Sequence, residues 1–202
     1  MPKLLLATAV ALSAAFAPLA ATASSEGAFL GASLGKARYD ADMGAYDGKW
    51  ARAYELLGGY RWKAGDRFAV GVEGGYANLG QIADRQHGAA TNKSTLVARA
   101  WLIGANGKWA MAKDWSLIGR AGIARTRSDF ESRSVAGSSR SRFRAHVTDS
   151  SVYLGTGVAY ALTPRADVSL QATRYLPSGR NTVVRNTRIA ATVLSAGAEF
   201  RF

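Results

Sequence analysis

Few residues in this chain have the types and spacing that acid–base chemistry requires. The sequence contains two histidines, His87 and His146, and no cysteine. His146 and Thr148 lie two residues apart in a long polar connection, and residues of these types can supply a general base and a hydroxyl nucleophile. An acidic third member is missing, because no glutamate follows until Glu199, and His87 with Asp84 is explained as well by the composition of a polar loop. The sequence therefore predicts no enzyme, no cofactor and no metal site.

Basic residues, by contrast, are abundant and unevenly distributed. The chain has a net charge of +12, and most of that excess falls in the long polar connections and the adjoining ends of the segments described below. Arginine dominates this set, and its planar guanidinium suits bidentate contact with phosphate. We expect a basic collar that binds a polyanion. The candidate contact residues are Arg99, Arg125, Arg127, Arg140, Arg142, Arg144, Arg174, Arg185 and Arg188.

The first 23 residues predict a secretory signal peptide. Lys3 precedes an apolar run that begins at Leu4, and Ala21-Thr22-Ala23 offers a small-x-small cleavage site. A membrane anchor is the alternative, but the run is rich in alanine and no basic stop-transfer segment follows. We expect residues 24–202 to form one exported domain, so the partner of its basic surface is not nucleic acid.

Apolar and polar residues alternate with a period of two along the rest of the chain, which indicates strands whose two faces have different surroundings. The alternation is clearest near the end, where one parity holds Leu194, Ala196, Ala198, Phe200 and Phe202. The expected strands are residues 27–39, 50–62, 67–79, 95–110, 115–127, 150–162, 166–175 and 188–202.

The connections between these strands alternate in length. Residues 63–66, 111–114 and 163–165 are short and contain turn residues, whereas residues 40–49, 80–94, 128–149 and 176–187 are long and polar. Short turns on one side and long loops on the other are typical of outer-membrane barrels, and tilted strands of about ten residues cross a bilayer. The sequence predicts an all-β fold, an eight-stranded antiparallel transmembrane up-and-down β-barrel, with its short turns in the periplasm.

The inward parity carries charges, chiefly Glu55, Glu73, Arg120, Glu199 and Arg201. Eight strands leave room inside only for side chains, and buried charges must be paired. We expect an internal ion-pair network that fills the barrel, with an ion path as the alternative. A soluble lipocalin-like barrel is the alternative fold, but such a barrel rarely puts Glu or Arg on the face opposite its aromatic residues.

Several segments resemble the small eight-stranded barrels of the OmpA type in Gram-negative outer membranes. Their order and spacing carry the resemblance: GASLG at 31–35, GGY at 58–60, VGVEGGY at 70–76, GVAYALTP at 157–164 and LSAGAEFRF at 194–202. The resemblance implies an outer-membrane location and makes Phe200 and Phe202 the signal that the outer-membrane assembly machinery reads. OmpA itself carries a peptidoglycan-binding domain after its barrel, and we expect no such anchoring role here.

The functional expectation is therefore a monomeric integral outer-membrane protein that supports envelope integrity and surface interaction. Its basic collar would contact outer-membrane lipid and lipopolysaccharide, and its outermost residues would be free for host or matrix polyanions in adhesion. A small porin-like channel is one alternative, because the resemblance includes an interior salt-bridge network proposed to gate a narrow path. A lipid A modifying enzyme that uses His146 and Thr148 is the less favoured alternative.

Overall fold

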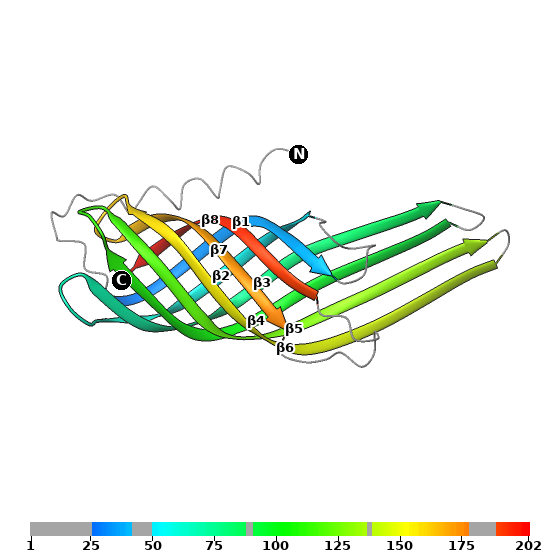
Figure 1. Ribbon diagram of the computed structural model, residues 1–202, viewed down its shortest axis with the longest axis horizontal. Coiled ribbons are helices and arrows are strands. Elements are labelled where there is room, and N and C mark those ends of the chain that lie inside the picture. Colours follow the sequence, from blue (N-terminus) through cyan, green and yellow to red (C-terminus); the bar gives the residue numbers. More distant parts are fainter. Residues whose placement is uncertain (1–25, 42–49, 88–90, 137–138, 178–188) are drawn as a thin grey trace, which may run out of the picture.

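The computed structural model describes residues 26–41, 50–87, 91–136, 139–177 and 189–202. Eight strands form a closed barrel in which each strand pairs with its neighbours in chain order and the last pairs with the first (Figure 1). The strands are β1 (Gly27–Ala41), β2 (Trp50–Lys63), β3 (Phe68–His87), β4 (Thr91–Ala110), β5 (Trp115–Ala136), β6 (Ser139–Ala161), β7 (Ala166–Pro177) and β8 (Ile189–Arg201). The expected eight-stranded antiparallel barrel is confirmed.

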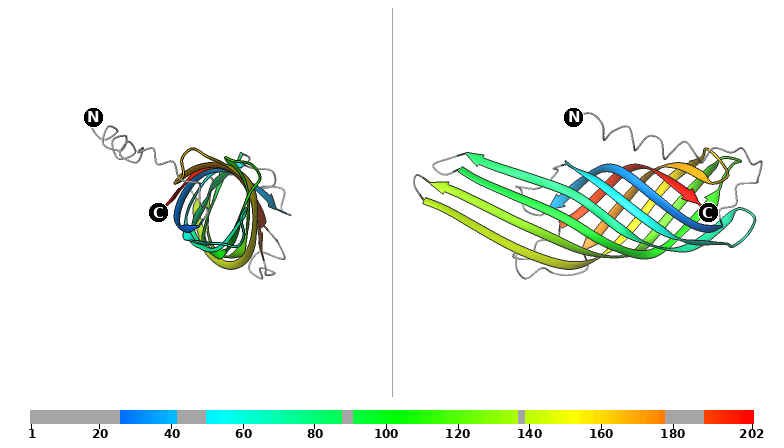
Figure 2. Two further views of the ribbon diagram at one scale, coloured as in Figure 1. Left: turned by 90° about the vertical axis from the view of Figure 1, so that its left-hand side faces the viewer. Right: turned by 180° about the vertical axis from the view of Figure 1, so that it is seen from behind.

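Closure depends on the pairing of β1 with β8. Their antiparallel register runs from Phe29 opposite Arg201 to Ala41 opposite Ile189. Beyond β8, the amide of Phe202 donates to the carbonyl oxygen of Ala28 at 3.0 Å. Seen end-on, the strands form a closed ring (Figure 2), so this part of the sheet leaves no open edge that would need water or another chain.

Most large aliphatic side chains point outward, whereas the interior holds paired charges, small residues and a few buried tyrosines such as Tyr153. Leu34 and Ile103 are 73% and 70% exposed, whereas Glu73 and Arg120 are buried. A soluble barrel would have the opposite arrangement, so the lipocalin-like alternative is wrong. Within the described residues, no helix has the length and apolar character needed to cross a membrane.

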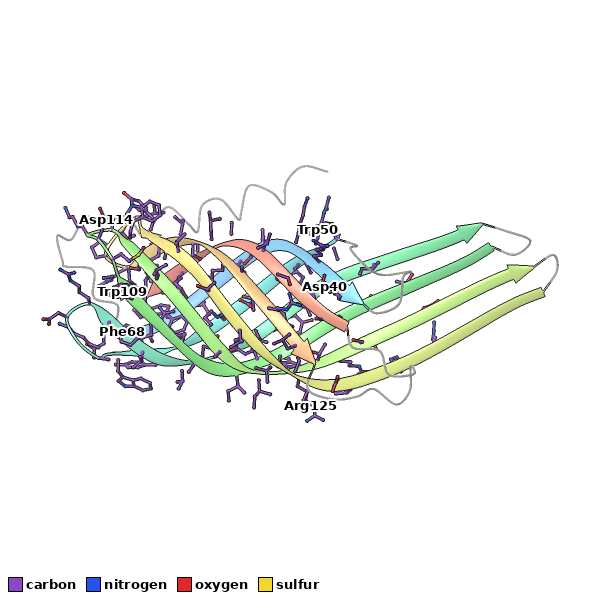
Figure 3. The ribbon with its side chains drawn as sticks, viewed as in Figure 1. Asp40, Trp50, Phe68, Trp109, Asp114 and Arg125 are labelled. Carbon is purple, nitrogen blue, oxygen red and sulfur yellow. The ribbon has the colours of Figure 1, made fainter. Side chains whose placement is uncertain are left out.

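Three tight turns join the strands at one end of the barrel, here called the turn end. In each, an amide donates back across the turn: Ala64 to Phe68 at 2.8 Å, Met111 to Trp115 at 3.0 Å and Leu162 to Ala166 at 2.9 Å. These turns lie where the sequence predicted short connections. Figure 3 shows Phe68, Trp109 and Asp114 at this end, and Asp40, Trp50 and Arg125 toward the opposite rim.

At that opposite rim, four strands continue past the barrel. The β3–β4 hairpin is paired as far as His87 and Thr91, the β5–β6 hairpin as far as Ala136 and Ser139, and Thr91 of β4 pairs with Val135 of β5. The result is a four-stranded projecting sheet (Figures 1 and 2). The expectation of loops at 80–94 and 128–149 is therefore wrong over most of their length.

A β-bulge at the rim explains part of this difference. The register between β3 and β4 shifts between Asn78 and Gly80, and the Asn78 side chain accepts a hydrogen bond from the Gly80 amide at 2.8 Å. Gly80 has φ = 92°, a conformation that favours glycine. Because of the extra residue, Leu79 and Ile82 are both buried although their parities differ. The period of two therefore breaks at this point of the sequence.

Candidate functional site

The rim half of the interior is organised around Arg120. Its Nε donates to Glu73 Oε1 and its Nη1 to Glu55 Oε1, each at 2.8 Å. The Tyr153 hydroxyl donates to the same Glu73 oxygen at 2.8 Å, and the Tyr175 hydroxyl donates to Glu55 Oε2 at 3.0 Å. These five residues, the Arg120 cluster, contain two acids and one base, each held by more than one partner.

A second network, the Arg61 cluster, lies closer to the turn end. Arg61 donates from Nη1 and Nη2 to the two carboxylate oxygens of Glu199 at 2.5 and 2.8 Å. Lys108 forms an ion pair with Asp167 and lies 3.9 Å from Glu199, while Arg201 Nη2 donates to Asp167 Oδ1 at 2.9 Å. This cluster contains three bases and two acids.

The structure thus brings together all five interior charges selected from the sequence, but in two separate groups. Arg61 and Asp167 were not selected, although both lie on the inward parity of expected strands. Extending the alternation through Glu55 on β2 reaches Arg61, and extending it back from Gln171 on β7 reaches Asp167. The alternation therefore identifies Arg61 and Asp167 as inward residues. It does not identify their partners, which lie far away in the sequence.

Between the two clusters lies a cavity of about 30 Å³. Its lining includes Glu55 and Arg120 from one cluster and Arg61 and Glu199 from the other. A space of this size holds about one water molecule. Side chains fill the barrel around it, as the small radius of eight strands requires.

The outward face near the rim carries the second candidate site, a ring of exposed basic side chains that we call the basic collar. Its members in the described residues are Lys36, Arg38, Arg52, Arg99, Arg125, Arg127 and Arg174. Trp50 and Trp101, which are 52% and 68% exposed, lie in the same zone. Lys36 is paired in register with Arg52, and Arg99 with Arg127. Like charges directly opposite each other repel.

Acids neutralise only part of the collar. Asp40 lies 3.7 Å from Arg38 and 3.5 Å from Arg174, and Asp129 lies 3.5 Å from Arg127. The other four members make no ion pair with an acid of the described residues; they are Lys36, Arg52, Arg99 and Arg125. The collar therefore has a local excess of positive charge.

The remaining candidate arginines are spread more widely. Arg140, Arg142 and Arg144 belong to the part of β6 in the projecting sheet, where Arg144 Nε lies 3.6 Å from Glu131 Oε2. Arg185 and Arg188 fall outside the described residues, as does the expected signal peptide at residues 1–23.

The histidines are not arranged as the sequence suggested. His146 Nδ1 lies 2.6 Å from Asp129 Oδ1 across the β5–β6 pair, and this hydrogen bond lowers the pKa of the Asp129 carboxyl. Both residues fall in the connection expected at 128–149, and only the pairing of β5 with β6 brings them together. Asp84 and His87 differ in parity, so β3 places them on opposite faces. In the parts of the chain that the structure describes, no group of three potential metal ligands occurs.

Paired aromatic residues surround the turn end on the outward face. The ring centroids of Tyr60 and Trp62 lie 5.2 Å apart, those of Trp115 and Tyr160 lie 5.1 Å apart, and those of Phe200 and Phe202 lie 5.2 Å apart. Phe202 is 74% exposed. With Trp50 and Trp101 near the rim, the barrel has two aromatic girdles with an aliphatic band between them.

Comparison with known proteins agrees with this architecture. The model of the family described as "Outer membrane protein beta-barrel domain" matches residues 7–202. Outer membrane protein P5 of Haemophilus influenzae is 25% identical over 156 residues, which cover 74% of this chain and 43% of the relative. The chain therefore spans less than half the length of the curated relative it matches.

Two solved structures share the fold. Ail, the attachment invasion locus protein of Yersinia pestis, solved with the heparin analogue sucrose octasulfate, is 15% identical with a TM-score of 0.51, covering 86% of this chain and 99% of Ail. The outer membrane protease OmpT of Escherichia coli is 11% identical with a TM-score of 0.53, covering 87% and 94%. At these identities the likeness shows the fold alone. The family match, together with the closed barrel, its outward aliphatic band and the homology to P5, shows that this chain belongs to the outer membrane protein β-barrel family and is an OmpA-like protein of the Gram-negative outer membrane.

Proposed function

We propose that this protein is a surface protein of the outer membrane that supports envelope integrity by binding the phosphate groups of lipopolysaccharide through its basic collar. The observation that carries the proposal is the register of the collar. Lys36 directly opposes Arg52, and Arg99 directly opposes Arg127, without enough neighbouring acid to neutralise them. Anions between such pairs convert repulsion into charge-assisted hydrogen bonds.

The height of the collar supports the same partner. Trp101 and Trp109 face outward on β4 eight residues apart, which corresponds to roughly 20 Å across a membrane for a tilted strand. Outer-membrane barrels have an apolar band of about 25 Å between their girdles. The collar then lies at the level of the lipid headgroups, with the projecting sheet outside the cell and the turn end in the periplasm.

The test compares binding of lipid A that carries both phosphates with binding of dephosphorylated lipid A. The collar variant is R99Q/R125Q, and the charge-matched control is K63Q/K113Q at the turn end. Native mass spectrometry of the full chain in detergent should show fewer bound phosphorylated lipids for the collar variant only. Equal binding by both variants, or equal binding of both lipids, would contradict the proposal.

Attachment to anionic surfaces is a second role that the projecting sheet supports. The sheet extends beyond the collar and carries further arginines, and Ail, which shares the fold, was solved with a heparin analogue. Catalysis is not part of the proposal, although OmpT shows that this fold can hold a protease. The exposed His146–Asp129 pair is the nearest approach to catalytic geometry, and it lies on an outward face rather than in a substrate cleft.

A channel is the remaining alternative for the barrel itself. The charges inside are engaged with one another, and the space between the two clusters holds about one water molecule. These contacts favour interior charges that fill and stabilise the barrel.

A further inference from the structure

The projecting sheet contains one row made entirely of basic residues. Arg85 on β3 is paired in register with Lys93 on β4, Lys93 with Arg133 on β5, and Arg133 with Arg142 on β6. Because adjacent strands lie about 4.8 Å apart, the four positions form a line of roughly 14 Å across the sheet. We call these four residues the distal basic row.

The row lies on the same side of the sheet as the collar but farther from the barrel. Counting in twos along β5 from Arg127, whose side chain is exposed on the outward face, reaches Arg133. Six residues separate the two arginines, about 20 Å along an extended strand. The next row outward contains Arg140 and no acid, and the next row inward contains Glu131 together with Arg144.

Protection of exposed sheet edges does not account for this row. Arginine or lysine on an edge strand prevents pairing with another sheet, and that explanation fits Arg85 and Arg142. Lys93 and Arg133, however, belong to β4 and β5, which are the inner strands of the projecting sheet. Like charges directly opposite on neighbouring strands are destabilising. A row that repeats this unfavourable pairing on all four strands is best explained by a ligand with several negative charges.

We propose that the distal basic row is a binding site for a linear anionic polysaccharide that lies across the four strands. The line of charges suits a polymer with repeated sulfate, phosphate or carboxylate groups better than a single headgroup. In the described residues β3 pairs with β2 only as far as Asn78, and β6 pairs with β7 only from Ser151. Within the described residues, both ends of the row therefore lie at an edge of the sheet, so the row crosses its full width.

This inference rests on the proposed orientation, in which the projecting sheet lies outside the cell, and it assigns a partner to a site distinct from the collar. The phosphates of lipid A reach the collar, about 20 Å lower along the strands. The distal basic row lies above that level, farther along the same strands.

The experiment uses the full chain in phospholipid nanodiscs without lipopolysaccharide and measures binding of heparin chains of defined length. The row variant is R85Q/K93Q/R133Q/R142Q, and the control is K63Q/R67Q/K113Q/R165Q, which removes the same charge from the turn end. We expect the row variant to bind a heparin dodecasaccharide about tenfold more weakly than the wild type, since several exposed ion pairs are lost. Its dependence on salt should fall as well, because fewer counterions are released.

The control variant should bind heparin as the wild type does, and a heparin disaccharide should bind all variants equally weakly. Equal binding of the dodecasaccharide by the row and control variants overturns the proposal. Nanodiscs that contain lipopolysaccharide provide the second arm: if it displaces heparin from the wild type, the row belongs to lipopolysaccharide instead. The row variant should still bind phosphorylated lipid A, whereas R99Q/R125Q should not. This difference distinguishes failure of the distal basic row from failure of the collar.

Discussion

Arg61 holds both carboxylate oxygens of Glu199, at 2.5 and 2.8 Å, although 138 residues separate them in the chain. Because β2 and β8 are each paired to opposite sides of β1, this one contact spans the strand pair that closes the barrel. The side-chain contact stabilises the closure from inside the barrel. The backbone hydrogen bonds between β1 and β8 stabilise it within the sheet.

Replacing Glu199 by Leu should lower the free energy of unfolding by about 3 kcal/mol or more, because Arg61 and Lys108 then keep buried charge without enough acid. The change in the free energy of unfolding is measured by urea titration in lipid vesicles, with the heat-dependent gel shift as the probe of folded protein. The double variant R61M/E199L should be less unstable than E199L alone. D66N, which changes an exposed turn residue, serves as the control. If D66N lowers the free energy of unfolding as much as E199L does, this account is contradicted.

The wild-type barrel should give no discrete conductance in planar bilayers. Its interior charges are paired, and the cavity between the two clusters has about 30 Å³, too little for a hydrated ion. Single-channel recording of the purified full chain, with a known porin as the positive control, measures this. Regular current steps in the absence of contaminating porin would favour the channel alternative.

Acidification should weaken the β5–β6 hairpin at the His146–Asp129 contact. The hydrogen bond from His146 lowers the pKa of the Asp129 carboxyl, so its contribution to stability is present above the ordinary carboxyl range and is lost as the pH falls through the lowered pKa. NMR titration of the Asp129 carboxyl carbon measures the pKa, which should rise in H146A. An unchanged titration in that variant would show that the contact does not persist in solution.

Lipid A from cells that produce H146A should be identical to lipid A from cells that produce the wild type. Thr148 lies two residues along the strand, but the imidazole is engaged by Asp129 on an exposed face. Mass spectrometry of the acyl pattern provides the measurement, with cells that lack the protein as the reference. An acyl change that depends on the protein and disappears in H146A would establish the enzyme alternative.

Phe202→Asp should sharply lower the amount of barrel in the outer membrane. Phe202 contributes an exposed ring to the turn-end girdle beside Phe200, and its amide bonds to Ala28 at the seam. A carboxylate there would place charge at the edge of the lipid band. The measurement is the amount of protein in the outer-membrane fraction that shows the heat-dependent gel shift. F202Y is the matched control. Arg201→Ala is an unsuitable control, since Arg201 bonds to buried Asp167.

Strand existence and side-chain direction could be predicted because lipid imposes a strict difference between the two faces. Trp101 and Trp109 fix the outward parity of β4, and the inward charges follow from the same alternation. For Arg61, the alternation predicts an inward side chain. It does not predict the partner, Glu199, which lies on the strand that closes the barrel. The contacts between inward charges depend on the stagger of neighbouring strands. The alternation of residues gives no information about that stagger.

The projecting sheet was missed for a different reason. In the proposed orientation neither face contacts lipid beyond the rim, and residues 128–136 and 139–149 lack the apolar alternation that identifies a membrane strand. The bulge at Gly80 also changes the parity of β3 at the point where the sheet leaves the barrel. The collar could be located from Arg99 and Arg125, whereas the distal basic row depends on registers that only the paired hairpins provide.

The unequal charges of the two interior clusters have a consequence for how such barrels change over time. The Arg61 cluster has one base more than it has acids, and the Arg120 cluster has one acid more than it has bases, so the interior is neutral only as a whole. A substitution that removes an acid from the Arg120 cluster can be compensated by loss of a base from the Arg61 cluster, because both clusters are then neutral. Among relatives, we therefore expect these two groups to vary together, as a single inherited unit spread over most of the strands.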